Sequence, residues 1–391
     1  MRVIGLMSGT SLDGIDAALV RFEGGEADLE WRLEAFHSRP YQAAERDRIH
    51  EAIRAGDART LCRLNVDLGE WLARAAVELC DSAGMAPSDI DVIGSHGQTV
   101  WHEPPAPDRR GATLQLGCAA TIAERTGIDV VSDFRARDVA AGGQGAPLVP
   151  FADRLLYALP DRTRILLNIG GMANLTRVPP CGDAAGLIAF DTGPGNALID
   201  AAVELATGGR EAFDRDGVRA RAGVLDERLL EELRADEWFD RRPPKSTGRE
   251  KFGRAFVQQL AARLKPADEA AWSDIVALLT ALTARAVADA IGRWVPVESG
   301  DDLVVTGGGA HNPVLIDALR AALPALNVMA GRDAGIDADA KEAIAFAALA
   351  WAHRRGIAGN VPEVTGAQGL RILGSFTPAS TPAPNRASRT S

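Results

Sequence analysis

The chain has 391 residues, of which 46% are hydrophobic and 25% charged, and its formal net charge is −10. This composition is ordinary for a globular protein and excludes the collagen-like, fibrous and wholly disordered classes. The acidic balance disfavours nucleic acid as a partner, and the length predicts about two domains. No apolar run reaches the roughly 18 residues that a membrane span needs. The residues Met1–Leu6 begin a strand-like pattern at once, so we expect no signal peptide and no membrane partner.

Strand and helix patterns alternate along the first part of the chain. Apolar runs between Gly-rich turns predict a three-strand meander, and further strands follow; together these are Arg2–Ser8, Ile15–Phe22, Leu29–His37, Asp91–Ser95, Thr113–Leu116 and Asp129–Phe134. Apolar residues at helical spacing predict the helices Ala43–Ala55, Val66–Cys80 and Ala119–Thr126. Strands that alternate with helices indicate the α/β class.

A second strand–turn–strand pattern opens later in the chain. Arg164–Ile169 predicts a strand, Gly170–Asn174 a Gly-rich turn, and Leu175–Val178 a returning strand. The repetition suggests a weak internal duplication. The loop Arg137–Pro150, which contains two adjacent glycines, is the candidate boundary between the two halves.

The remaining patterns complete the expected domain organisation. The further predicted elements are the strands Leu187–Phe190 and Asp302–Thr306 and the helices Ile275–Ile291, Pro313–Leu323 and Lys341–Ala352. We expect one lobe over residues 1–136, onto which a helix at about 353–374 packs back, and a second lobe over 137–352. Residues 375–391 lack the apolar content to offset chain entropy, so we expect a disordered tail there.

Cysteine and histidine usage argues against disulfide and metal frameworks. The four cysteines (Cys62, Cys80, Cys118 and Cys181) are far apart and form no C-x-x-C pair, which predicts buried free thiols in a reducing cytosol. No cluster of cysteine and histidine has metal-ligand spacing, so we expect no metal-ligating protein cluster.

Three Gly-rich loops are candidates for binding phosphate. They are Gly9–Gly14, Gly170–Gly171 and Gly307–Gly309, and each follows a predicted strand. Glycines let the backbone turn closely around a ligand, and exposed N–H groups can hold phosphate oxygens. The first loop is not a Walker loop, because the pattern G-x-x-x-x-G-K-[ST] is absent, and it is not a dinucleotide fingerprint, because a strand and not a helix follows it. Ordinary hairpin and strand–helix turns are the alternative interpretation.

Three further features could carry chemistry. Asp191 stands at the end of an apolar strand, where ligands bind in α/β sheets, so it can serve as a general base or simply cap a turn. His96 follows another strand and could be a polar contact or a base. The segment Arg241–Lys251 holds five basic residues and one acidic residue, which suits an anionic ligand or a solvated loop.

Eight motifs, in order, resemble those of the anhydro-N-acetylmuramic acid kinases, a bacterial branch of the superfamily of sugar kinases, actin and heat-shock chaperone ATPases. The motifs are Gly5–Gly14, Gly94–Thr99, Asp133–Arg135, Gly142–Pro150, Asn168–Gly171, Asp191–Asn196, Lys245–Glu250 and Gly307–Gly309. The resemblance implies two ribonuclease-H-like, actin-like ATPase lobes with a central cleft for ATP and substrate. It implies that ATP and water convert 1,6-anhydro-N-acetylmuramic acid to N-acetylmuramic acid 6-phosphate in peptidoglycan recycling. We also expect a cytoplasmic homodimer.

The resemblance also assigns roles to residues. The nucleotide is expected at Gly9, Thr10, Ser11, Leu12, Asp13, Gly14, Ile15, Asp16, Gly170, Gly171, Gly307, Gly308 and Gly309, and the sugar at His96, Gln98, Arg135 and Glu342. Asp191 is the expected catalytic base: it takes a proton from the water that attacks the anomeric carbon, and O6 then takes the γ-phosphoryl group. Asp133 and His96 are the next candidates for the base.

Magnesium and the substrate class leave alternatives open. Mg²⁺ is expected with ATP and binds largely through phosphates and water. Met7 and Asn168 stand where the superfamily usually has an aspartate, so the side chain that holds Mg²⁺ stays open; Asp13 is one candidate, and no metal site is assigned. The alternatives to this kinase are an actin-like or chaperone-like ATPase switch and a kinase of another sugar.

Overall fold

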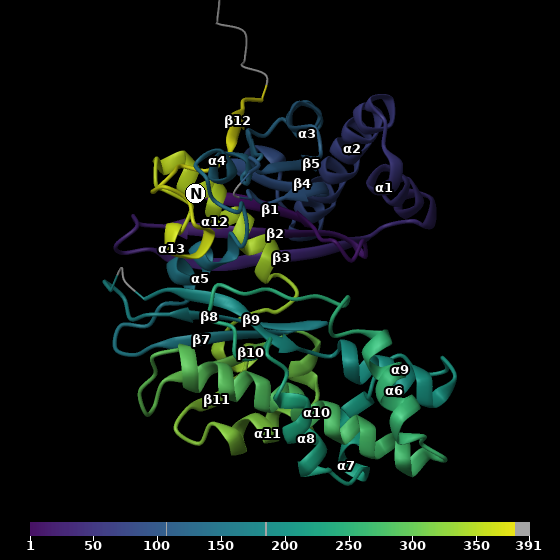
Figure 1. Ribbon diagram of the computed structural model, residues 1–391. Coiled ribbons are helices and arrows are strands. Elements are labelled where there is room, and N and C mark those ends of the chain that lie inside the picture. Colours follow the sequence, from purple (N-terminus) through teal and green to yellow (C-terminus); the bar gives the residue numbers. More distant parts are fainter. Residues whose placement is uncertain (107, 184–185, 380–391) are drawn as a thin grey trace, which may run out of the picture. The chain divides into compact units, whose positions relative to one another are not determined.

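The computed structural model describes residues 1–106, 108–183 and 186–379 (Figure 1). The chain forms two compact units, and both ends of the chain build the first of them. Unit 1 contains residues 1–156 and the segment that starts at Asp339, and unit 2 is the continuous stretch Tyr157–Ala338. These limits differ from the expected lobe limits at residues 136 and 352.

Helix α5 (Val149–Tyr157) explains where the first segment of unit 1 ends. Trp31 donates its indole N–H to the carbonyl of Leu156 at 3.0 Å. Lys341 forms a salt bridge with Asp153 at 3.1 Å. Both contacts tie α5 to unit 1, so the expected boundary loop Arg137–Pro150 does not separate the units. That loop contains α4 (Ala136–Ala140) and the start of α5.

The sheet of unit 1 has seven strands in the order β12-β6-β4-β1-β2-β3, with β5 paired to β4. The strands are β1 (Arg2–Ser8), β2 (Gly14–Glu23), β3 (Glu30–Pro40), β4 (Val92–Glu103), β5 (Ala112–Leu116), β6 (Val130–Ser132) and β12 (Ser375–Thr377). The meander β1-β2-β3 is antiparallel, and β4 and β6 continue parallel to β1. The expectation of disorder from residue 375 is wrong at its start, because β12 pairs with β6; residues 380–391 lie outside the described residues.

Helices cover both faces of this sheet. They are α1 (Ala43–Ala55), α2 (Ala58–Ala83), α3 (Ala119–Thr126), α4, α5, α12 (Lys341–Arg355) and α13 (Pro362–Thr365), with a 3₁₀ turn at Pro87–Asp89. Helix α12 packs directly on β1 and β4, because both strands present a glycine to it. A Cβ on Gly5 would lie 1.8 Å from the carbonyl oxygen of Ala343, and one on Gly94 would lie 2.3 Å from that of Phe346.

Unit 2 repeats the order of five strands of unit 1, β6-β4-β1-β2-β3. Its sheet runs β11-β10-β7-β8-β9, with β7 (Arg164–Ile169), β8 (Met172–Val178), β9 (Ile188–Pro194), β10 (Asp302–Thr306) and β11 (Asn327–Ala330). The meander β7-β8-β9 is antiparallel, and β10 and β11 are parallel to β7. The same path in both units confirms the internal duplication and the two ribonuclease-H-like lobes of the expected α/β fold.

The helices of unit 2 surround one long apolar helix, α10. They are α6 (Ala197–Thr207), α7 (Val218–Ala222), α8 (Glu227–Arg234), α9 (Arg254–Leu264), α10 (Glu269–Trp294) and α11 (Pro313–Ala322), with 3₁₀ turns at Arg215–Gly217, Gly308–His311 and Gly331–Ala334. Among the described residues, α10 alone is long and apolar enough to cross a membrane, so the expectation that no run is long enough is wrong. However, 67% of that stretch is buried, and its side chains belong to both apolar clusters of unit 2.

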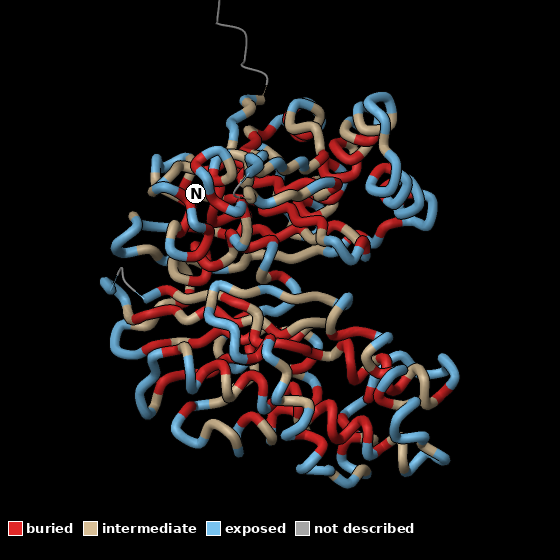
Figure 2. Tube along the Cα trace, viewed as in Figure 1, coloured by how far each residue is buried: buried red, intermediate tan, exposed pale blue. Residues whose placement is uncertain are grey.

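Burial follows the strands and the helix faces that cover them, as Figure 2 shows within each unit. The cysteines fit this pattern only in part. All four are free, as expected, but Cys62 and Cys181 are exposed and only Cys80 is buried.

Candidate active site

The first glycine-rich loop, Gly9–Gly14, joins β1 to β2 and exposes a polar tip. Thr10, Ser11 and Asp13 are exposed, whereas Leu12 and Ile15 are buried in the core of unit 1. Leu12 has a φ of 56°, which is unusual for a residue other than glycine. Its buried side chain anchors the loop while the hydroxyl groups face outward. The tip therefore suits a phosphate, but Leu12 and Ile15 could meet a nucleotide only through their backbone.

The two glycines that bound this loop differ in what they allow. Neither has a φ in the left-handed region. A Cβ on Gly14 would lie 2.4 Å from the carbonyl oxygen of Arg39, so Gly14 is needed for the packing of β2 on β3. A Cβ on Gly9 would meet only the hydroxyl of Ser11, at 3.7 Å. Gly9 therefore leaves open space in front of the loop.

Three of the four expected sugar contacts come together in unit 1, and we call His96, Arg135 and Glu342 the sugar cluster. Arg135 donates from Nε to Nε2 of His96 at 3.0 Å and from Nη1 to the carbonyl of Gly145 at 2.8 Å. Burial lowers the pKa of Arg135 to about 10, while the charge of Glu342 opposes that shift. The guanidinium is thus held in a fixed orientation beside a carboxylate.

His96 is neutral in this setting. Burial and the adjacent charge of Arg135 lower the pKa of His96 to about 3. Its Nδ1 lies 2.8 Å from the carbonyl oxygen of Gly97, so Nδ1 carries the proton and Nε2 accepts from Arg135. A histidine whose acceptor nitrogen is occupied and whose pKa is this low is a poor general base. The geometry favours the polar-contact interpretation of His96.

Gln98 lies outside the sugar cluster. It is fully buried, its Oε1 accepts from the hydroxyl of Ser8 at 2.5 Å, and its Nε2 donates to the carbonyl of Thr99 at 3.2 Å. The Ser8 hydroxyl is also 2.7 Å from that of Tyr41. Because these groups satisfy each other, Gln98 supports the end of β1 rather than reaching a ligand.

Two carboxylates of unit 1 have raised pKa values near the expected ligand residues. Glu342 stands in the first turn of α12, and burial raises its pKa, with Asp16 adding repulsion and Lys341 and Arg135 opposing. Burial also raises the pKa of Asp16, which the hydroxyl of Ser38 lowers in part. The electrostatic coupling of Asp16 and Glu342 connects the phosphate loop side of unit 1 with the sugar cluster.

Asp191, the expected base, is held by its neighbours at one oxygen. It lies on β9, its backbone N–H donates to the carbonyl of Lys245 at 3.0 Å, and its Oδ2 accepts from the N–H of Thr247 at 2.9 Å. No described residue donates to Oδ1. Burial raises the pKa of Asp191, and the Thr247 hydrogen bond and the Lys245 charge oppose the shift. A raised pKa brings a carboxylate closer to the range in which a general base is effective.

The basic segment Arg241–Lys251 is largely engaged within unit 2. Lys245 lies 4.3 Å from the ring centre of Trp238 and donates to the carbonyl of Phe239 at 2.9 Å. Burial lowers the pKa of Lys245 to about 8. Lys251 pairs with Asp236 at 2.8 Å. The excess positive charge that the sequence suggests is therefore partly compensated.

The second glycine hairpin, Gly170–Gly171, meets the start of α6. The carbonyl of Gly170 accepts from the N–H of Asn196 at 2.8 Å, and that of Gly171 accepts from Ala197 at 3.0 Å. Guanidinium atoms of Arg249 lie 3.4 and 3.5 Å from the position of a Cβ on Gly171. The hairpin thus combines a close backbone turn with a cation, which fits an anionic group.

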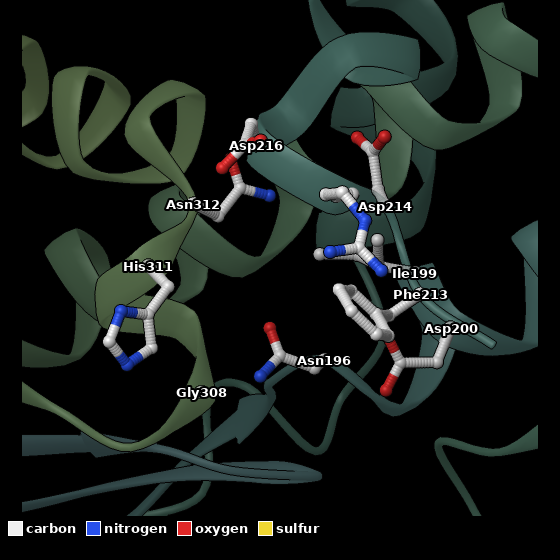
Figure 3. Close-up of a pocket in the computed structure, with 10 residues that line it drawn as sticks. Asn196, Ile199, Asp200, Phe213, Asp214, Asp216, Gly308, His311 and Asn312 are labelled. Carbon is white, nitrogen blue, oxygen red and sulfur yellow. The ribbon is translucent and has the colours of Figure 1, made fainter.

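The triple glycine borders a pocket of ≈ 470 Å³ in unit 2 (Figure 3). The pocket is lined by Asn196, Ile199, Asp200, Phe213, Asp214, Arg215, Asp216, Gly308, His311 and Asn312. In Figure 3 the His311 side chain and the Phe213 ring lie on either side of the Asn196 amide. Ligand pockets combine such apolar walls with a few placed polar groups. The arrangement suits a flat ring attached to a polar, hydroxyl-bearing group.

Two positions of the triple glycine beside this pocket, Gly307 and Gly309, require glycine. Gly307 has a φ of 75°, and a Cβ there would lie 2.5 Å from Oδ1 of Asn168. A Cβ on Gly309 would lie 2.5 Å from the side chain of Ile169. Gly308 itself lines the pocket, so the backbone of the motif can approach a ligand closely.

A family profile described as Anhydro-N-acetylmuramic acid kinase matches residues 1–379. A curated protein named "Anhydro-N-acetylmuramic acid kinase" from Caldanaerobacter subterraneus subsp. tengcongensis is 44% identical over 382 residues, which cover 96% of each chain. One of the same name from Ralstonia nicotianae is 45% identical over 393 residues, which cover 97% of each chain. The chain belongs to the anhydro-N-acetylmuramic acid kinase family.

Solved structures show weaker likeness to this member of the anhydro-N-acetylmuramic acid kinase family. An activator of the 2-hydroxyisocaproyl-CoA dehydratase from Clostridium difficile with bound ADPNP has a TM-score of 0.44 and 14% identity, covering 91% of this chain and 96% of that chain. A ROK family glucokinase from Streptomyces griseus has a TM-score of 0.38 and 13% identity, covering 89% and 99%. At this level of similarity, family membership rests on the sequence matches.

Several contacts at the site could not be predicted from the sequence of this anhydro-N-acetylmuramic acid kinase family member. Thr247 and Lys245 hold Asp191, Arg249 lies against the Gly171 hairpin, and Phe213 and His311 line the pocket. The basic segment gave a signal for Arg249 and Lys245. Phe213 stands in an irregular segment and His311 at the end of the short 3₁₀ turn Gly308–His311, so no periodic pattern indicates which way either side chain points.

The described residues contain no group of three or more His, Cys, Asp or Glu side chains that could hold a metal ion. Met7 is buried, and Oδ1 of Asn168 faces Gly307. Asp13 is exposed on the phosphate loop and belongs to no such group among the described residues. This donor set fits a magnesium ion carried by phosphates and water, as the anhydro-N-acetylmuramic acid kinase family resemblance implies, and does not fit a protein-built metal cage.

Proposed function

We propose that this enzyme uses ATP and water to convert 1,6-anhydro-N-acetylmuramic acid to N-acetylmuramic acid 6-phosphate and ADP. The observation that carries the proposal is the state of Asp191: one oxygen is fixed by Thr247, the other has no donor among the described residues, and burial raises its pKa. The carboxylate is oriented by the protein and retains a free acceptor for a water proton. Membership of the kinase family supplies the substrate.

The reaction balances with Asp191 as the base. Oδ1 of Asp191 takes one proton from water, and the water oxygen bonds to the anomeric carbon as the bond from that carbon to the bridging O6 breaks. The freed O6 bonds to the γ-phosphorus of ATP, and the bond to the β–γ bridging oxygen breaks to release ADP. The proton on Asp191 is then returned to solvent. Raised basicity at a held carboxylate is what the first step requires.

The sugar contacts are assigned to the sugar cluster. Nε2 of neutral His96 accepts from Nε of Arg135 and the carbonyl of Gly145 accepts from Nη1, so Nη2 of Arg135 remains the donor for a ligand. Surrounding protein groups raise the pKa of Glu342, but its side chain keeps access to solvent and is assigned to accept hydrogen bonds from sugar hydroxyls. Arg135 is suited to an anionic or carbonyl substituent, because a guanidinium binds carboxylates in a planar, directional way.

The nucleotide contacts are assigned to the three glycine loops. The pocket beside Gly308 takes the adenosine, and Phe213 and His311 supply flat surfaces for the base. In unit 1 the phosphate loop is assigned to phosphate groups, and in unit 2 the Gly170–Gly171 hairpin with Arg249 is assigned to an anionic group. Bound Mg²⁺ would neutralise phosphate charge, with Asp13 as the one carboxylate exposed on the phosphate loop. Phosphoryl transfer depends mainly on such positioning and electrostatics.

Product analysis in ¹⁸O-water tests the proposal. We expect 1,6-anhydro-N-acetylmuramic acid and ATP to give a sugar phosphate with the label at the C1 hydroxyl and an unlabelled phosphoryl group. Early quenching limits exchange of the anomeric oxygen. Labelled free phosphate without sugar phosphate would instead identify an ATPase. Faster turnover of 1,6-anhydro-N-acetylglucosamine, which lacks the lactyl group, would identify a kinase of another sugar.

The role in peptidoglycan recycling, the cytoplasmic location and the homodimer remain part of the proposal. Recycling follows from the substrate, because an anhydromuramic acid arises from cell-wall breakdown. The oligomeric state can be measured by sedimentation of the purified chain, and a monomer at all concentrations would contradict the homodimer. Mass spectrometry of fractionated cells tests the location.

A further inference from the structure

A fully buried carboxylate outside the expected site links the C-terminal segment of unit 1 to the sugar cluster. Asp138 lies in α4 and has 0% exposure. Its Oδ1 accepts from Nδ2 of Asn360 at 2.9 Å and from the hydroxyl of Thr365 at 2.8 Å. Its Oδ2 accepts from the N–H of Gly145 at 2.8 Å. The carboxylate therefore joins two segments that are more than two hundred residues apart in the chain.

The backbone of Gly145 connects the Asp138 carboxylate with the guanidinium of Arg135. The N–H of Gly145 is bound by Asp138, and its carbonyl accepts from Nη1 of Arg135 at 2.8 Å. Gly145 has a φ of 70°, and a Cβ there would lie 2.6 Å from Val139. Hydrogen bonds at both the N–H and the C=O of Gly145 restrict its backbone, and with it the direction of its carbonyl. That carbonyl and His96 are the two acceptors that orient the guanidinium.

The partners of Asp138 are themselves fixed. The N–H of Gln144 donates to the carbonyl of Thr365 at 2.7 Å, and Gln368 donates to Ala141 at 2.9 Å. Oδ1 of Asn360 accepts from the N–H of Arg371 at 2.6 Å. These hydrogen bonds close a ring of contacts around the buried carboxylate. Buried networks of this kind specify one arrangement when every member is satisfied.

We propose that Asp138 is a positioning residue for sugar binding, and that Asn360 and Thr365 hold it in place. The identity of the sugar in this inference rests on the proposed function. Without the Asp138 carboxylate, the Gly145 peptide is released and Arg135 loses one of its two fixed acceptors. The ligand groups affected are those that a guanidinium binds, a carboxylate or carbonyl oxygen of the sugar. A site misplacement of about 1 Å can cost a factor of about 10².

Substitutions at Thr365 test this with little risk to folding. Thr365→Val keeps the shape and removes the hydroxyl, whereas Thr365→Ser keeps the hydroxyl. We expect Thr365→Val to raise KM for the anhydrosugar about tenfold, with kcat and KM for ATP unchanged, because loss of ground-state and transition-state binding together raises KM alone. Thr365→Ser should restore the wild-type KM. Asp138→Asn should raise KM for the sugar more, by about 10–100-fold.

A readout that does not depend on activity separates this inference from the proposed function. Long-range ¹⁵N–¹H spectra report the Nε2 environment of His96, with His96→Gln to assign the signal. We expect Thr365→Val and Asp138→Asn to shift that signal, because the Arg135 hydrogen bond to Nε2 changes. A wild-type enzyme that makes no sugar phosphate would end the proposed function, while a shifted His96 signal would still support the positioning role.

A matched control shows what a merely structural carboxylate does. Asp301 in unit 2 is 4% exposed, and it accepts from the N–H groups of Thr163 at 3.0 Å and Glu298 at 2.8 Å. Asp301→Asn should lower the melting temperature and leave KM for the sugar and the His96 signal unchanged. The same result for Asp138→Asn and Thr365→Val, lower stability with unchanged KM and His96 signal, would overturn the inference.

Discussion

The N–H of Thr247 lies 2.9 Å from Oδ2 of Asp191, whereas no described residue donates a hydrogen bond to Oδ1. Because Lys245 accepts from the N–H of Asp191 at 3.0 Å, the segment and the strand hold each other in register. A carboxylate fixed at one oxygen has a defined direction for proton transfer at the other. The proposed proton transfer to Asp191 therefore depends on a single carboxylate oxygen.

Asp191→Asn should abolish most turnover while both ligands still bind. The amide keeps the size and shape of the carboxylate but cannot take a proton, and loss of a general base typically costs about 10²–10⁴ in rate. Steady-state kinetics and calorimetric titration of ATP and sugar check this. Asp226→Asn is the control, since Asp226 caps α8 by accepting from Leu229 and belongs to neither ligand site. Normal turnover of Asp191→Asn would move the base elsewhere, with Asp133 next.

The pH profile should show one acidic limb that belongs to Asp191. The base is active when ionised, so kcat/KM falls as pH decreases through its pKa, and burial raises that pKa above the ordinary value for aspartate of about 3.9. His96, with a pKa of about 3, contributes no limb near neutrality. His96→Gln should therefore raise KM for the sugar but keep the position of the limb. A limb that disappears in His96→Gln would restore histidine as the base.

Gly5→Ala should destabilise unit 1 strongly. Its Cβ would lie 1.8 Å from the carbonyl of Ala343 and would force α12 away from β1. Overpacking costs about 1–3 kcal/mol, and a clash with backbone belongs at or above the upper end of that range. Gly292→Ala is the control, because Gly292 lies in α10 with nothing within 4 Å of a Cβ. It should gain about 0.5–1 kcal/mol in the free energy of unfolding, measured by urea titration.

Gly307→Ala should weaken nucleotide binding more than tenfold. The residue has a φ of 75°, and the added Cβ would lie 2.5 Å from Asn168, so the loop beside the pocket must move. Gly335→Ala separates this effect from backbone strain, because Gly335 has a φ of 73° and open space around it. Both variants should lose about 1–2 kcal/mol of stability. Equal ATP affinity in titrations of the two variants would remove the triple glycine from the site.

Truncation after Gly374 should lower the melting temperature, because it removes β12 from its pairing with β6. The ring of Phe376 also lies 4.5 Å from the guanidinium of Arg354. Each cross-strand pair contributes about 0.2–1 kcal/mol, so we expect a loss of about 1–2 kcal/mol. A chain that ends at Ala379 is the control and should melt as the full chain does. Identical melting of both truncated chains would show that β12 contributes nothing.

The local sequence pattern was sufficient to predict the bounds of those helices and strands that depend on residues close to them in the chain. The expected bounds of Arg2–Ser8, Arg164–Ile169 and Ala119–Thr126 match the structure, because apolar runs and glycine stops bound each of them. Gly127, for example, ends α3 with a φ of 69°. Asp191 and the glycine loops were selected because each follows a predicted strand; in the structure Asp191 lies within β9, and the roles of these residues stay predictions.

Features that depend on distant partners could not be predicted in this way. Ser375–Thr377 is short and polar at its ends, and it becomes a strand only because Val130–Ser132 offers an edge. Asp138 looks like any acidic residue in a short helix until Asn360 and Thr365 meet it. Gln98 was assigned to the sugar by resemblance, but the hydroxyl of Ser8, ninety residues away, satisfies it.

The discontinuous path of unit 1 also sets an order of completion during synthesis. All of unit 2 lies between residues 157 and 338, so a ribosome releases it before Asp339 emerges. Domains that are complete in sequence can fold as they are made. Helix α12, which packs on the glycines of β1 and β4, starts at Lys341 and is therefore synthesised long after these strands. The sheet face that α12 covers is therefore completed only after all of unit 2 has been synthesised.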